Sequence, residues 1–327
     1  MTHPEAKDAA RSARPTDDLT SPAAIERLRA RDRRFVAAAI TELERLTPRV
    51  TQLLEALQPH LGKALVIGFT GPPGAGKSTL VNALIRVLRA HDKTVGVIAV
   101  DPSSPVSGGA ILGDRIRMTA ALDDDGVFVR SLASRGYLGG LSPAAVRIID
   151  ALDAAGYDVI ILETVGTGQN EIDVAEVADV RVVISAPGLG DDIQAMKSGL
   201  LEIADILVVN KGDREGAERT LQQLVGALSI RAGAAAKVPV LKTTATTGAG
   251  VEDLDAAIWS IGGAVMARGT QERRRRRARY LIARAAADLV AERIRSGAGT
   301  RLDKLADEIL SGRLPVDAAA RDILSGD

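Results

Sequence analysis

The sequence predicts an α/β fold: a doubly wound, mostly parallel sheet with helices before it and a helical arm after it. Short, continuously apolar runs are typical of strands buried on both faces of a parallel sheet. They alternate with segments of helical periodicity that would serve as crossovers. The expected strands are 64–69, 94–100, 127–130, 159–162, 181–185, 206–210 and 238–241, and the expected crossover helices lie near 78–90, 142–155, 192–203 and 214–229.

The residues before the sheet predict a disordered arm and a short helical segment. Residues 1–20 are rich in Ala, Pro, Asp, Thr and Arg without periodicity, which is typical of disorder. Ser21 and Pro22 have the character of an N-cap and a first helical residue. Apolar residues at helical spacing follow, and Thr47-Pro48 restarts a second helix. We therefore expect a helical segment over 21–60.

The central domain is expected over 61–268 and a C-terminal helical region over 269–327. Five arginines, Arg273 to Arg277, precede a helix that also carries Asp288 and Glu292. A nucleic-acid or membrane footprint would be one interpretation of this run. Because no stacking aromatics interrupt it and acids follow, a solvated helix face is the favoured interpretation.

Composition excludes several function classes. The chain has no cysteine, which excludes disulfides, thiolate metal sites, iron–sulfur clusters and cysteine nucleophiles. Its 42 Lys+Arg balance its 42 Asp+Glu, so the chain has no net positive charge that would attract nucleic acid. His3, His60 and His91 lie far apart in the sequence and do not have the spacing of metal ligands, so a histidine-built zinc or nickel site is not expected. The longest apolar runs are far shorter than the ~20 residues of a membrane span, and the N-terminus does not have the pattern of a signal peptide. We expect a cytoplasmic protein without nucleic-acid or membrane partners.

A glycine-rich motif follows the first expected strand and opens the next expected helix. Residues 71–78 match the pattern G-x-x-x-x-G-K-[ST]. Glycines let main-chain N–H groups close around anionic oxygens, and the helix N-terminus adds partial positive charge. Lys77 would reach the β- and γ-phosphates, and the Ser78 hydroxyl would complete a Mg²⁺ shell. The expected nucleotide contacts of this loop are Gly71, Gly74, Ala75, Gly76, Lys77, Ser78 and Thr79.

A second motif selects the base. Residues 210–213 read Asn-Lys-Gly-Asp at the end of a later expected strand. The Asp213 carboxylate can accept hydrogen bonds from the ring N–H and the exocyclic amine of guanine, a pair that adenine lacks. Asn210 and Lys211 would brace this loop against the phosphate loop and cover the base, and the Ala245 N–H would meet the guanine carbonyl. The expected base-pocket residues are Asn210, Lys211, Asp213, Thr244 and Ala245, and the ligands are GTP and GDP.

Three acids stand where Mg²⁺ would find oxygen ligands. Asp101 and Glu163 end expected strands beside the phosphate loop, and Asp114 follows a Pro/Ser/Gly-rich loop. Gly166 would offer its N–H to the γ-phosphate, so that hydrolysis would release the following loop. The expected catalytic residues are Lys77, Asp101, Asp114 and Glu163, and the expected metal ligands are Ser78 and these three acids.

The residue after Gly166 departs from Ras-like GTPases, in which a glutamine at that place orients the attacking water. Thr167 occupies the place here, and Gln169 lies two residues further on. We therefore predict slow intrinsic hydrolysis that needs a partner or a rearranged loop for acceleration.

With these motifs the chain resembles the MeaB/ArgK (MMAA-type) GTPases, the G-protein chaperones of adenosylcobalamin-dependent acyl-CoA mutases. The resemblance covers nearly the whole chain. The motifs that carry it are Asp-Pro-Ser-Ser at 101–104, Gly-Asp-Arg-Ile-Arg-Met at 113–118, Glu-Thr-Val-Gly-Thr-Gly-Gln at 163–169, Asn-Lys-Gly-Asp at 210–213 and Gly-Arg-Leu-Pro at 312–315.

The resemblance implies a homodimer joined through C-terminal helices, and a GTPase cycle that gates adenosylcobalamin loading and protects an acyl-CoA mutase. A cobalamin adenosyltransferase is a further candidate partner. The family's third switch loop maps onto 188–197, where Gln194 and Lys197 would couple the nucleotide state to the partner.

The resemblance leaves the client mutase open between methylmalonyl-CoA mutase and an isobutyryl- or hydroxyisobutyryl-type enzyme. Gln-Ala-Met-Lys-Ser-Gly at 194–199 is more similar to the G-domains of isobutyryl-CoA-type mutases than to the Gln-Gly-Ile-Lys form. Thr167 stands where the family usually has Val, and Gly212 where Ala is usual.

Two other functions have weaker support from the sequence. An ATPase or kinase linked to amino-acid (arginine/ornithine) transport would not need the guanine-selective motif at 210–213. A nickel-insertion GTPase would be expected to carry clusters of Cys and His, which this sequence lacks.

Overall fold

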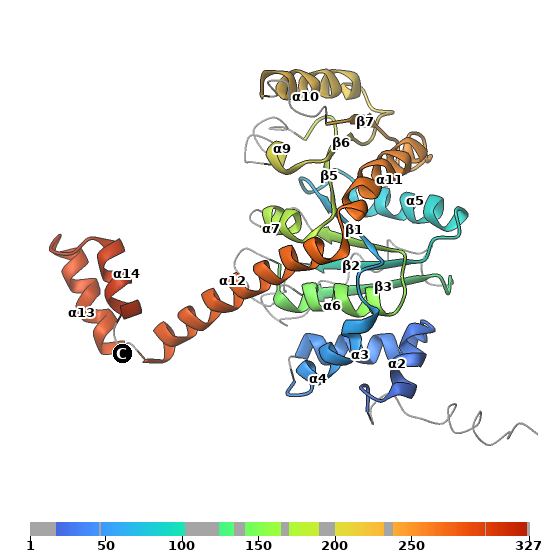
Figure 1. Ribbon diagram of the computed structural model, residues 1–327. Coiled ribbons are helices and arrows are strands. Elements are labelled where there is room, and N and C mark those ends of the chain that lie inside the picture. The colour runs from blue at the N-terminus through green and yellow to red at the C-terminus, as the bar shows by residue number, and fades with distance from the viewer. Residues whose placement is uncertain are drawn as a thin grey trace, which may run out of the picture. The chain divides into compact units, whose positions relative to one another are not determined.

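A seven-stranded parallel sheet organises the larger part of the chain (Figure 1). The structure is a computed structural model that describes residues 18–45, 47–101, 124–133, 141–164, 170–189, 200–231, 238–297 and 299–325. The chain divides into two units, Met1–Arg276 and Arg277–Asp327. The sheet and its helices belong to the first unit, and the predicted fold class is confirmed.

The strands lie in the order β3-β2-β4-β1-β5-β6-β7, with each pair of neighbours parallel. Their bounds are β1 Leu65–Thr70, β2 Val95–Asp101, β3 Val127–Ala133, β4 Val159–Thr164, β5 Val180–Ser185, β6 Ile206–Val209 and β7 Val240–Lys242. β1, β4 and β6 are buried along their whole length, which explains their continuously apolar sequences. Because all strands run the same way, the segments that follow them leave from one edge of the sheet, where open α/β sheets bind their ligands.

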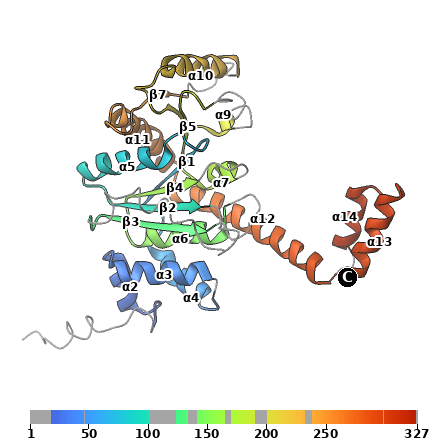
Figure 2. The same cartoon turned by 180° about the vertical axis from the view of Figure 1, so that it is seen from behind.

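Helices cover both faces of the sheet (Figures 1 and 2). On one face α5 (Lys77–Ala90) and α11 (Val251–Ala267) share the largest apolar core with the strands. The other face carries α6 (Pro143–Ala154), α7 (Asn170–Val177), α9 (Leu200–Ile203) and α10 (Ala217–Arg231). Two glycines allow close packing there, because a Cβ on Gly68 would lie 2.2 Å from Val174 of α7 and one on Gly96 would lie 2.9 Å from Leu152 of α6.

Three helices precede the sheet: α2 (Pro22–Arg29), α3 (Arg33–Arg45) and α4 (Val50–Leu57), followed by the short 3-10 helix η1 (Gln58–His60). α3 and α4 pack against α6, and α2 packs against α3. Ser21 caps α2 as predicted, since its hydroxyl accepts a hydrogen bond from the Ala24 N–H at 3.3 Å. Arg130 of β3 forms an ion pair with Glu44 of α3, which connects the edge strand to this helical layer. Most of the predicted disordered arm, residues 1–17, lies outside the described residues.

The last helices are α12 (Thr270–Gly297), which begins in the first unit and continues into the second, α13 (Gly299–Leu310) and α14 (Val316–Ser325). In the second unit several large apolar side chains are exposed, among them Leu289 (72%), Leu310 (85%) and Val316 (68%). The predicted domain boundaries remain a prediction. Among the helices of the described ranges, none is long and apolar enough to cross a membrane.

The interpretation of the arginine run as a solvated helix face is wrong for part of the run. Arg273 and Arg277 are each only 4% exposed, whereas Arg275 is exposed. Arg273 donates from Nη1 to Asp179 at 3.0 Å, and Arg276 donates from Nη2 to the same carboxylate at 3.1 Å. The sequence motif misleads because residues three and four apart share a helix face, so a run of identical residues does not show which of them is buried.

Candidate functional site

The glycine-rich loop 71–76 connects β1 to α5, and its glycines adopt backbone conformations that other residues rarely adopt. The φ angles of Gly71, Gly74 and Gly76 are 143°, 78° and 88°. A Cβ on Gly71 would lie 2.1 Å from the Ile184 carbonyl oxygen of β5, and a Cβ on Gly76 would lie 2.6 Å from Nδ2 of Asn210. Glycine is therefore required at both positions for the loop to approach its neighbours.

The N-terminus of α5 is shaped for an anion. Gly76 is its N-cap in a left-handed conformation, and no side chain caps the helix. Its first N–H groups and its dipole therefore face the loop. Lys77 is 7% exposed, and its Nζ donates to the carbonyl oxygens of Gly71 at 2.7 Å and Pro72 at 3.0 Å.

A hydroxyl and a carboxylate meet at the carboxyl edge of the sheet. The Ser78 Oγ donates to Glu163 Oε1 at 2.6 Å, and Glu163 is 5% exposed. Val100 pairs with Thr164, so Asp101 and Glu163 lie close to the ends of neighbouring strands. Hard oxygen donors of this kind suit Mg²⁺, so the residues present fit this ion.

Several predicted residues lie outside the described residues: Asp114, Gly166, Gln194 and Lys197, together with Thr167 and Gln169. The Asp101 side chain is also outside the description, although its backbone ends β2. Within the described part of the chain no group of three or more His, Asp or Glu side chains could hold a metal ion.

The base-pocket loop and the phosphate loop are bound to each other, as the sequence predicted. Asn210 Nδ2 donates to the Ala75 carbonyl oxygen at 3.0 Å and to that of Gly76 at 3.3 Å. Lys211 Nζ donates to the Gly74 carbonyl oxygen at 2.6 Å. These contacts bring together two segments that are far apart in the sequence.

Asn210 also binds the segment after β7. Its Oδ1 accepts hydrogen bonds from the Ala245 N–H and the Thr243 hydroxyl, both at 3.2 Å. One fully buried amide side chain thus joins three strand-end segments. The Ala245 N–H, predicted to meet a guanine carbonyl, is bonded to Asn210 in this structure, and its contact with a base remains a prediction.

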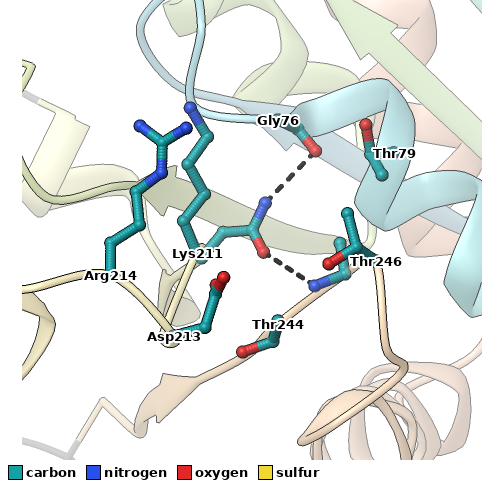
Figure 3. A pocket seen from close by; sticks show the side chains of 9 residues that line it. Gly76, Thr79, Lys211, Asp213, Arg214, Thr244 and Thr246 are labelled. Carbon is teal, nitrogen blue, oxygen red and sulfur yellow. Dashed lines mark hydrogen bonds between the residues drawn. The ribbon is translucent and has the colours of Figure 1, made fainter.

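A cavity of about 140 Å³ lies between these segments (Figure 3). In the view of Figure 3 the Asp213 carboxylate lies above Thr244. The lining residues are Gly76, Thr79, Asn210, Lys211, Asp213, Arg214, Thr244, Ala245 and Thr246. The structure therefore brings seven of the predicted nucleotide-contact residues to one cavity.

Arg214 and Thr246 also line the cavity and were not predicted. Each directly follows a predicted residue, Asp213 or Ala245, and that adjacency is the only sequence signal that could have found them. The glycine at position 212 has a local explanation. A Cβ on Gly212 would lie 2.8 Å from Cγ of Lys242 and 3.1 Å from the Thr243 carbonyl oxygen, to which the Gly212 N–H is bonded at 2.8 Å.

Comparison with known proteins supports the same assignment. The family described as methylmalonyl-CoA mutase-associated GTPase MeaB matches residues 36–299. GTPase ArgK of Escherichia coli is 46% identical over 201 residues, which are 60% of this chain and 61% of ArgK. The mouse protein named methylmalonic aciduria type A homolog, mitochondrial, is 34% identical over 241 residues, which are 68% of this chain and 58% of that protein.

A solved structure has the same fold over the full length. The crystal structure of an LAO/AO transport system kinase superposes with a TM-score of 0.73 at 27% identity and covers 99% of this chain and 98% of that one. The resemblance inferred from the motifs is confirmed. The phosphate loop on β1, the strand-end segments that it binds and the family match over residues 36–299 together show that the chain belongs to the MeaB family of P-loop GTPases.

Proposed function

We propose that the protein binds GTP and GDP with Mg²⁺ in the cytoplasm. Its GTPase cycle would gate the loading of adenosylcobalamin into an acyl-CoA mutase and protect that mutase. The observation that carries the nucleotide part is the position of Asn210, whose side chain bonds to the phosphate loop at Ala75 and to the base-pocket segment at Ala245. A ligand with phosphates in the loop and a base against Asp213 would touch both.

Main-chain N–H groups of the glycine-rich loop and the uncapped N-terminus of α5 would bind the β- and γ-phosphates. Lys77 would exchange its present acceptors, the carbonyl oxygens of Gly71 and Pro72, for phosphate oxygens. These groups stabilise the negative charge that develops during phosphoryl transfer.

Ser78, Asp101, Asp114 and Glu163 would hold Mg²⁺. The ion, when bound, neutralises charge between the β- and γ-phosphates. The hydrogen bond between Ser78 and Glu163 supports this role, because it orients the hydroxyl and keeps the carboxylate within its reach. Gly166 would bind the γ-phosphate, and with Thr167 after it we propose that intrinsic hydrolysis is slow and that a partner accelerates it.

Base selection tests the nucleotide part. We expect calorimetry to show that the wild type prefers GDP over ADP by about 10⁴-fold, the discrimination reached by sites that hydrogen-bond a distinguishing group. Asp213→Asn should relax this preference and improve binding of xanthosine diphosphate, whereas Asp253→Asn on the exposed side of α11 should not. Lys77→Ala should abolish binding or hydrolysis. A guanine preference that survives Asp213→Asn would contradict the role of this carboxylate, and equal competition by ATP would favour the transport-kinase alternative.

The mutase part rests on the family, whose description names a mutase-associated GTPase, and on the residues at 194–197 that would couple to the partner. The exposed apolar residues of the second unit support the proposed homodimer, because amphipathic helices such as α13 and α14 require a partner surface to bury these residues. Pull-down of methylmalonyl-CoA and isobutyryl-CoA-type mutases, and of a cobalamin adenosyltransferase, with GDP or a non-hydrolysable GTP analogue would test this part. We expect nucleotide-dependent capture of a mutase and stimulated hydrolysis in the same mixture; neither effect with any mutase would contradict it.

A further inference from the structure

Arg214 lies in the wall of the cavity next to Asp213 and has no role in the motif that identified this site. Its main-chain N–H donates to the Lys211 carbonyl oxygen at 3.0 Å, which closes a turn, and Lys211 itself has a φ of 57°. The turn therefore presents three charged side chains, Lys211, Asp213 and Arg214, from one short loop. In the view of Figure 3 the Lys211 and Arg214 side chains extend in the same direction from this loop.

The two cations of this wall differ in their partners. Lys211 Nζ is bonded to the Gly74 carbonyl oxygen at 2.6 Å. Arg214 is exposed, and among the described residues its guanidinium forms no ion pair or hydrogen bond. By contrast, Arg89 and Arg181 pair with Asp124 and Asp205 at 2.8 and 2.7 Å. The guanidinium of Arg214 is therefore available to a ligand in the cavity.

The chemistry of a guanidinium suits the face of a base. It is planar and weakly hydrated, and it stacks on π-systems, where it gains a cation–π attraction that an ammonium on a flexible stem provides less well. A purine whose edge is bonded to Asp213 would present one of its faces to the neighbouring side chains of the same loop. The phosphates would lie at the other end, at the glycine-rich loop and the start of α5.

We propose that Arg214 is a nucleotide-contacting residue that covers one face of the bound guanine base. This inference rests on the proposed guanine-nucleotide site and adds a second determinant to it. Asp213 would select the base by its edge, and Arg214 would add affinity through the face. Since GDP and GTP share the base, Arg214 contributes equally to the binding of both.

The experiment is calorimetric titration of the full-length protein with GDP and with a non-hydrolysable GTP analogue, in the presence of Mg²⁺ and at low and high KCl. Arg214→Ala should weaken binding of both nucleotides by the same factor, about two- to fivefold, as expected for an exposed cation–π contact. Arg214→Lys keeps the positive charge but lacks the planar guanidinium group, so its affinities should resemble those of Arg214→Ala. The matched control is Arg219→Ala, which removes an exposed arginine of α10 that does not line the cavity.

Three results would overturn the inference: unchanged affinity in Arg214→Ala, full rescue by Arg214→Lys, or a loss that is larger for the GTP analogue and decreases at high salt. The last two results would indicate that the Arg214 charge interacts with the phosphates and not with the base. Failure of the proposed function is distinguishable, because it would appear in the wild type as absence of a preference for GDP over ADP. A wild type with that preference and an unaffected Arg214→Ala variant would refute only the role of Arg214.

Discussion

Removing Arg273 should destabilise the first unit strongly, because this side chain neutralises a fully buried carboxylate. Asp179 has no exposed side-chain surface, and its Oδ2 accepts hydrogen bonds from Arg273 Nη1 and from the Val66 N–H, both at 3.0 Å. Arg273 also donates to the carbonyl oxygens of Gly62 at 2.8 Å and Ala64 at 3.0 Å. One guanidinium thus binds α12 to the start of β1 and to the residue that precedes β5.

The size of the destabilisation follows from the buried Asp179 carboxylate, which loses one of its two arginine partners in Arg273→Met. Breaking a buried ion pair by removing one partner costs about 3–5 kcal/mol, since the remaining charge stays away from water. Arg276 still donates to Asp179 Oδ1 at 3.1 Å, which reduces the penalty. We therefore expect a loss near the lower limit, about 3 kcal/mol, or a decrease in melting temperature of roughly 5–10 °C.

The measurement is urea and thermal unfolding followed by the fluorescence of Trp259, the chain's single tryptophan, which lies on α11 in the same unit. Urea is preferred to guanidinium chloride because it does not screen the ion pair. Arg275→Met is the matched control, because it makes the same chemical change two residues away at an exposed position of the same helix. Its free energy of unfolding should stay within about 0.5 kcal/mol of the wild type.

A double-mutant cycle with Asp179→Asn separates the ion pair from the loss of the arginine stem. If the pair is responsible, the double variant should lose clearly less than the sum of the two single variants. Equal stabilities of Arg273→Met and Arg275→Met, or strict additivity in the cycle, would refute the reasoning.

Three further changes test the packing and the electrostatics of the first unit. Gly263→Ala should raise the free energy of unfolding by about 0.5–1 kcal/mol, because Gly263 lies inside α11 and an added Cβ would meet no atom within 4 Å. Gly68→Ala should lower it by about 1–3 kcal/mol, since the Cβ would lie 2.2 Å from Val174, and urea unfolding of both variants checks the opposite signs. Burial raises the pKa of the Asp255 carboxyl, against the opposing charge of His91, 3.3 Å away. The wild type therefore loses stability as pH rises through that raised pKa, whereas Asp255→Asn has no group that titrates there. The melting temperature of Asp255→Asn minus that of the wild type should therefore increase from about pH 3 to about pH 7, and a decrease would contradict the raised pKa.

The sheet could be predicted from the sequence because its signal is local. Strands buried on both faces must be apolar throughout, and β1 and β4 illustrate this with six buried residues each. The phosphate loop was predictable for a similar reason. Its glycines are required by backbone conformation and by close neighbours such as the Ile184 carbonyl oxygen, so their spacing appears in the sequence itself.

The contacts that join distant segments were predictable only where a motif already names both ends. Asn210 was expected to brace the phosphate loop and does so. The pair between Arg273 and Asp179 was not expected, because the arginine run does not indicate a partner for Arg273, Asp179 belongs to no motif, and the two residues are separated by 94 positions. From the sequence alone, both Asp179 near the end of α7 and Arg273 at the start of α12 could equally be exposed to solvent. Only the fold shows that they form a buried pair.

The cavity that Asp213 and Arg214 line shows why a motif underestimates a site. The motif at 210–213 specifies only the side chains whose chemistry the site requires. The cavity is also lined by residues that the same turn places in its wall. Arg214 enters the wall because the turn closed by its own N–H continues past Asp213 before α10 begins at Ala217. A residue of this kind would add affinity without changing which base is selected. The prediction that Arg214→Ala weakens GDP and GTP binding equally, while Asp213→Asn changes which base is bound, tests this division between edge and face.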